Sequence, residues 1–199
     1  MLIKASTITN LTDARYFAAK EVDFLGFNLE EGTEDYLDPI FMKAIREWVE
    51  GPKIVGEFGE TPAGTVLEAA RFFELDVVQV GPINDLSQLK DLEVILTLPA
   101  TEDPTGLEAI FQKNAPHVAY FLLDFSAQKN AAAKLQDHAA AWKKLFSTYP
   151  TLLDVNLEAD ALATLLDQLN PAGLALRGGE EEQVGVKSFD EIDAIFDAL

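Results

Sequence analysis

The stretch Leu2-Ile3-Lys4-Ala5-Ser6-Thr7-Ile8-Thr9-Asn10 decides how the chain folds. Its first residues predict a short strand, and Thr9 or Asn10 can cap the helix that follows. Asp13 falls in the first turn of that helix, where an acidic side chain suits the helix dipole. The stretch therefore predicts a strand–turn–helix unit, and the later parts of the chain repeat this theme.

Alternation along this first strand gives its two faces different chemistry. Lys4 and Ser6 share one face, while Ile3 and Ala5 share the other. A lysine beside a hydroxyl at the carboxyl end of a strand is typical of an active site in an α/β protein. We therefore take Lys4 and Ser6 as candidate site residues.

The rest of the chain alternates strand and helix without a long linker. Further strands are predicted at Phe24–Asn28, Lys53–Phe58, Val77–Val80, Val94–Leu98, Val118–Leu123, Thr151–Val155 and Leu174–Leu176. Helices are predicted at Leu11–Lys20, Ile40–Val49, from Thr61 onward, around Asp85–Leu89, and at Gly106–Asn114, Ala139–Phe146, Ala159–Leu169 and Phe189–Leu199.

Eight such units predict a (βα)8 barrel, with parallel strands inside and helices outside, as one domain over residues 1–199. The alternative is an open doubly wound sheet. That fold normally carries a glycine-rich first turn, and Ser6-Thr7-Ile8 is not one.

Composition narrows the classes of function. The chain has 48% hydrophobic and 25% charged residues, which is typical of a globular protein, and a formal net charge of −19. Nucleic acid and anionic membranes are poor partners for such a charge, because binding them needs clustered Lys and Arg. The chain has no cysteine, no transmembrane stretch and no secretory signal pattern, so we expect a cytoplasmic location.

The opening also resembles a known family. The sequence Lys4-Ala5-Ser6-Thr7-Ile8-Thr9, then Asp13-Ala14, then Asp23-Phe24-Leu25-Gly26-Phe27, is similar to the start of phosphoribosylanthranilate isomerase. That family reads Lys-Ile-Cys-Gly-Ile-Thr, then Asp-Ala, then Asp-Phe-Leu-Gly-Phe. The resemblance runs from about Leu2 to Leu199 and is strongest in the first third and at Gly178–Lys187. It implies a (βα)8 TIM barrel.

The resemblance implies an Amadori rearrangement that uses one acid and one base. The family's acid ends the sixth strand, which corresponds to Asp124, and its base is the cysteine that corresponds to Ser6. An alcohol acts as a base only if another group takes its proton. Lys4 lies on the same face and could do so if burial favours its neutral form. Ser6 as a hydrogen-bonded structural residue, and Asp124 as a strand-end cap or a partner of Lys4, are the alternatives.

The family's phosphate-binding loops are only partly matched. The loop after the sixth strand lacks glycine, and Asp154 brings a negative charge to the loop after the seventh. Arg177, Gly178 and Gly179 match the third loop and are candidate phosphate contacts. Gln79 matches a further substrate contact of the family. The family's arginine after the second strand and its histidine after the fourth have no counterpart here.

These departures predict an isomerase-like protein whose activity is lost or altered. The alternatives are a binding or scaffold barrel without catalysis, and a different small-molecule enzyme that uses Lys4 and Asp124. We expect a small-molecule ligand, which is phosphorylated in the family, no cofactor, and a monomer or homodimer. His117 and His138 are isolated and predicted to be surface or boundary residues, and no residue spacing indicates a metal site.

Overall fold

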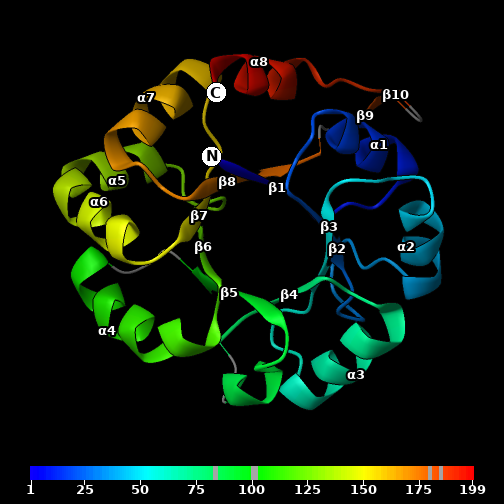
Figure 1. Ribbon diagram of the computed structural model, residues 1–199. Coiled ribbons are helices and arrows are strands. Elements are labelled where there is room, and N and C mark those ends of the chain that lie inside the picture. The colour runs from blue at the N-terminus through cyan, green and yellow to red at the C-terminus, as the bar shows by residue number, and fades with distance from the viewer. Residues whose placement is uncertain (83–84, 100–102, 179–180, 184–185) are drawn as a thin grey trace.

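Eight parallel strands form a closed barrel surrounded by helices (Figure 1). A computed structural model describes residues 1–82, 85–99, 103–178, 181–183 and 186–199. Each strand pairs with its neighbours in chain order, and β1 closes the barrel by pairing with β8, from Leu2 opposite Gly173 to Ser6 opposite Arg177. The predicted (βα)8 barrel is therefore confirmed, and the open sheet is excluded.

The barrel strands fall close to their predicted places. They are β1 Leu2–Ser6, β2 Phe24–Asn28, β3 Lys53–Glu57, β4 Val77–Val80, β5 Glu93–Pro99, β6 Tyr120–Asp124, β7 Thr151–Asp154 and β8 Gly173–Arg177. The α-helices are α1 Leu11–Ala19, α2 Pro39–Arg46, α3 Ala63–Phe73, α4 Pro104–Asn114, α5 Ala131–Asp137, α6 Ala139–Thr148, α7 Ala159–Leu169 and α8 Asp190–Ala198. Short 3₁₀ turns occupy η1 Leu86–Leu89 and η2 Ala115–His117.

Strand alternation produces two separate cores. One cluster fills the barrel with side chains from seven strands, namely Phe24, Val55, Val77, Ile95, Leu122, Leu152 and Ala175. The other cluster lies between the barrel and the helices, and it includes Ile3 and Ala5. Lys4 and Ser6 therefore point into the barrel, because they alternate with these two outward residues.

Local sequence signals fix where several helices begin. The Asn10 side chain accepts a hydrogen bond from the Asp13 backbone N–H at 2.9 Å, which caps α1. Asp38 and Asp103 cap α2 and α4 in the same way, each followed by a proline that the first helical turn tolerates. These caps orient the helices that pack on the barrel.

Some boundaries differ from the sequence predictions. Helix α2 ends at Arg46 rather than Val49, and Gly51, with a φ of 108°, lies in the segment between α2 and β3. Leu199, predicted on the apolar side of the last helix, is 47% exposed because it lies beyond the end of α8. Two short antiparallel strands that were not predicted, β9 Glu181–Gln183 and β10 Val186–Lys187, follow β8.

None of the helices among the described residues combines the length and apolarity needed to cross a bilayer. His117 and His138 are both exposed, as predicted from their isolation in the sequence.

Candidate functional site

Polar side chains crowd the carboxyl-terminal mouth of the barrel. Side chains alternate between the two faces of a strand, and the core cluster inside the barrel marks the inward face. Counting along each strand from that face puts one inward-facing polar side chain per strand at this mouth. In strand order these residues are Ser6, Asn28, Glu57, Gln79, Thr97, Asp124, Asp154 and Arg177. In (βα)8 enzymes this end of the barrel carries the active site, so this ring is the candidate functional site.

Lys4 lies one layer below the mouth and joins two strands of the ring. Its side chain is fully buried, and its Nζ donates hydrogen bonds to Ser6 Oγ at 2.8 Å and to Glu57 Oε1. The Lys4–Glu57 ion pair is itself buried, with 10% of the Glu57 side chain exposed. The structure thus shows Lys4 in contact with Ser6. The carboxylate that pairs with Lys4 is Glu57, and not Asp124 as the alternative in the sequence analysis had it.

Asp124 ends β6 and is held by the loop that follows it. Its Oδ1 accepts hydrogen bonds from the backbone N–H of Ser126 at 2.9 Å and from Ser126 Oγ at 2.5 Å. Phe125 turns outward and is buried against the Trp142 ring, with ring centres 5.8 Å apart. The start of this loop therefore fixes the Asp124 carboxylate without placing an aromatic ring in the mouth.

Asp154 and Arg177 form a second charged pair in the mouth. Arg177 Nη2 lies 3.4 Å from Asp154 Oδ2. Burial raises the pKa of Asp154 to about 6 and the nearby Asp124 charge adds to this, while Arg177 and Lys4 oppose it. The pair brings an acid to the end of β7, beside the residues that match the family's phosphate contacts.

The predicted substrate contacts that the structure describes lie in β4 and at the end of β8. Arg177 is half-exposed at the end of β8 and Gly178 follows it, whereas Gly179 lies outside the described residues. Gln79 Oε1 and Thr97 Oγ1 are buried without a hydrogen-bond partner in the described part of the chain. A ligand with hydrogen-bond donors would satisfy both oxygens.

Sequence reasoning missed Asn28, Glu57 and Thr97 as site residues. Glu57 ends an apolar strand, just as Asp124 does, so the signal that selected Asp124 also marks Glu57. Thr97 carries no such signal, because a threonine within a strand is ordinary. No set of three His, Cys, Asp or Glu side chains suited to a metal occurs among the residues that the structure describes.

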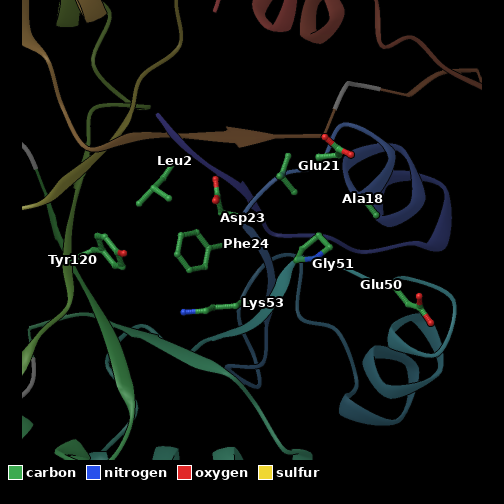
Figure 2. Close-up of a pocket in the computed structure, with 11 residues that line it drawn as sticks. Leu2, Ala18, Glu21, Asp23, Phe24, Glu50, Gly51, Lys53 and Tyr120 are labelled. Atoms are coloured by element: carbon green, nitrogen blue, oxygen red, sulfur yellow. The ribbon is translucent and has the colours of Figure 1, made fainter.

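A cavity of about 580 Å³ opens at the other end of the barrel. Figure 2 shows Leu2, Phe24 and Tyr120 lining it, with the Lys53 side chain beside the Phe24 ring. Lys53 Nζ binds Glu93 Oε2 at 2.6 Å. Because these residues begin their strands, the cavity lies at the amino-terminal face, where barrel residues serve stability rather than catalysis.

The matching family model and the curated relatives point to one family. The family model for N-(5'phosphoribosyl)anthranilate (PRA) isomerase matches residues 3–198. An N-(5'-phosphoribosyl)anthranilate isomerase from Maridesulfovibrio salexigens is 26% identical over 204 residues, covering 100% of this chain and 98% of the relative.

Solved isomerase structures share the fold. A structure of monomers of the dimeric phosphoribosylanthranilate isomerase from Thermotoga maritima superposes with a TM-score of 0.74 at 18% identity, covering 100% of this chain and 98% of that one. A phosphoribosylanthranilate isomerase in complex with reduced 1-(o-carboxyphenylamino)-1-deoxyribulose 5-phosphate gives a TM-score of 0.75 at 18% identity, with the same coverage. The ligand of that relative carries a phosphate.

Proposed function

The chain belongs to the N-(5'-phosphoribosyl)anthranilate isomerase family of tryptophan biosynthesis, and on that premise we propose that it catalyses the family's Amadori rearrangement with altered efficiency. The observation that carries this proposal is the hydrogen bond from Lys4 Nζ to Ser6 Oγ, in the same mouth as the fixed Asp124 carboxylate. The mouth thus holds a group for each of the two proton transfers that the reaction needs.

In the proposed mechanism Asp124 is the acid. In its protonated form it donates a proton to the ribose ring oxygen, and the ring opens to a protonated Schiff base. The two hydrogen bonds from Ser126 hold one carboxyl oxygen, which leaves Oδ2 to face the substrate. Ser6 then removes the C2′ proton with Lys4 behind it, which shifts the double bond toward the product.

The phosphate is expected to bind less tightly than in relatives with glycine-rich loops. Arg177 and Gly178 would contact it, with Gly179 as a further candidate. Asp154 already pairs with Arg177, and its carboxylate would lie beside a phosphate bound there. This is the reason for proposing altered rather than unchanged efficiency.

The test is an isomerase assay with phosphoribosylanthranilate, run beside the Thermotoga maritima relative. We expect turnover that is lower than that of the relative. Asp124→Asn should lower kcat by about 10²-fold or more, because it removes the proposed acid. Asp91→Asn, which changes an exposed aspartate in the turn before β5, should leave kcat unchanged.

Ser6→Cys provides the second arm of the test. A thiol near its usual pKa of about 8.5 supplies some thiolate at neutral pH, so this variant should turn over faster than the natural protein. No turnover by the natural protein and none after Ser6→Cys would contradict the proposal. That result would favour a binding barrel or a different small-molecule enzyme using Lys4 and Asp124.

A further inference from the structure

Glu57 is the one carboxylate that contacts Lys4 in the described part of the barrel. The two side chains come from β1 and β3, on either side of β2. Lys4 is completely buried, and burying an ammonium group is costly unless a charge and hydrogen bonds compensate it. Glu57 supplies the charge, and Ser6 Oγ supplies a second acceptor at 2.8 Å.

Glu57 also holds the backbone next to Ser6. Its Oε2 accepts hydrogen bonds from the Thr7 N–H and from Thr7 Oγ1, both at 3.2 Å. Thr7 has a φ of 55°, a left-handed conformation that is unfavourable for a β-branched residue. These two bonds stabilise that conformation, so one carboxylate fixes both Lys4 and the turn that carries Ser6.

Strand β2 lies between the two strands that carry this pair, and it leaves room for their contact because residue 26 is glycine. A Cβ atom on Gly26 would overlap Glu57 Oε1 and would lie 2.7 Å from Lys4 Nζ. The missing side chain at Gly26 is therefore a requirement of the Lys4–Glu57 contact.

The contact changes what Lys4 can do for Ser6. A charged lysine only donates hydrogen bonds, so Lys4 cannot take the Ser6 proton while it keeps all of its own. Glu57 accepts a hydrogen bond from the same nitrogen and can receive one of those protons. The three side chains thus lie in the order that a proton relay needs.

We propose that Glu57 is the positioning residue and final proton acceptor of the Ser6–Lys4 base. When the C2′–H bond of the substrate breaks, its proton goes to Ser6 Oγ and its electron pair stays with the substrate. One Lys4 proton first goes to Glu57 Oε1, and the neutral Lys4 Nζ then takes the Ser6 hydroxyl proton. At the end Ser6 is again an alcohol, Lys4 is again an ammonium ion, and Glu57 is a neutral acid. The cationic Schiff base becomes a neutral enamine, so charge balances.

This inference rests on the proposed function. Its test compares substitutions of two glutamates. Glu57→Gln removes the acceptor but keeps the size of the side chain. Glu93→Gln breaks another strand-borne Lys–Glu pair, Lys53–Glu93, at the far end of the barrel. We expect Glu57→Gln to lower kcat on phosphoribosylanthranilate by about 10²-fold with KM changed less than about threefold, and Glu93→Gln to change neither.

Two further measurements separate chemistry from structure. Glu57→Asp keeps a carboxyl group and should retain about ten times more kcat than Glu57→Gln, since a carboxylate can still accept the proton. Proton–nitrogen correlation NMR should show a slowly exchanging Lys4 ammonium signal in the natural protein and in Glu93→Gln. That signal should disappear in Glu57→Gln.

The outcomes distinguish this inference from the proposed function. Equal kcat values for Glu57→Gln and Glu57→Asp, or an unchanged Lys4 signal in Glu57→Gln, would overturn the relay. A rise in KM alone would also overturn it, because it would mean that Glu57 only shapes the pocket. If the natural protein shows the Lys4 signal but no turnover, the proposed function fails while the Lys4–Glu57 linkage stands.

Discussion

Asp154 is a buried acid whose ionisation opposes folding. Its pKa is about 6 in the folded protein, compared with 3.8 for an unperturbed aspartate. The folded state therefore holds the proton more tightly than the unfolded state. The resulting cost is absent below about pH 4, grows as the pH rises to about 6, and stays constant above that value. At 1.36 kcal/mol for each pKa unit its upper limit is about 3 kcal/mol.

Asp154→Asn should therefore stabilise the protein at neutral and alkaline pH. We expect the free energy of unfolding to rise by about 1–3 kcal/mol at pH 8, and the difference to vanish near pH 4. Arg177 loses its partner, but it is half-exposed and water replaces the carboxylate. Urea unfolding at both pH values, with Asp91→Asn as the control, measures the effect. A gain of equal size at both pH values would contradict the titration as its cause.

At the scale of single residues, the sequence predicted only contacts between residues that are close together in the chain. The shared face of Lys4 and Ser6 follows from alternation within five residues, and the structure shows the two in contact. The Lys4–Glu57 pair spans 53 residues of sequence. It depends on the register of three strands and on Gly26 between them, and neither can be derived from local patterns.

At the scale of the element, β2 determines whether that pair can exist. Gly26→Ala would place a methyl group where Glu57 Oε1 and Lys4 Nζ now lie. We expect the barrel to fold with lower stability, by about 1–3 kcal/mol as in other overpacked sites, and isomerase turnover to fall with it. Thermal unfolding and the isomerase assay check both effects.

Gly64→Ala is the matched control for this substitution. Gly64 lies in α3, and a Cβ built there meets no atom within 4 Å apart from its chain neighbours and the nearby backbone of its own helix. This variant should keep its turnover and gain a little stability, since alanine favours helix. Full turnover in Gly26→Ala would show that the Lys4–Glu57 contact is not needed for activity.

The elements themselves were predictable because their signals are short-range. Strands such as β2 and β4 and the helix α7 have the predicted bounds, because apolar runs and turn residues specify them directly. The end of α2 was wrong because Trp48, which extends the helical pattern, is 69% exposed and adds no packing to hold another turn. The pair β9 and β10 is too short to produce a periodic pattern.

At the scale of the whole molecule, net charge affects how an anionic substrate binds. The chain carries a formal charge of −19, and phosphoribosylanthranilate is itself anionic. Locally, Asp154 offsets Arg177, so the overall negative charge of the protein would repel this proposed substrate. Salt screens this repulsion, since the Debye length falls to about 8 Å at physiological ionic strength.

Added salt should therefore lower KM. We expect KM to fall about two- to threefold between about 20 mM and 200 mM NaCl, with kcat unchanged. Initial rates over a substrate series at each salt concentration give both constants. A KM that rises with salt would mean that a local cationic site, rather than the overall charge, governs binding.

The pairing of β1 with β8 has a consequence for synthesis in the cell. These strands lie at opposite ends of the sequence and share five register pairs (Figure 1). Until Arg177 has left the ribosome, β1 and β7 are the two open edges of an incomplete sheet. Translation slows the closing step to the pace of chain growth, about 5–20 residues each second. For those seconds the nascent chain exposes strand edges that could pair with other chains, so chaperone contact is most useful just before β8 emerges.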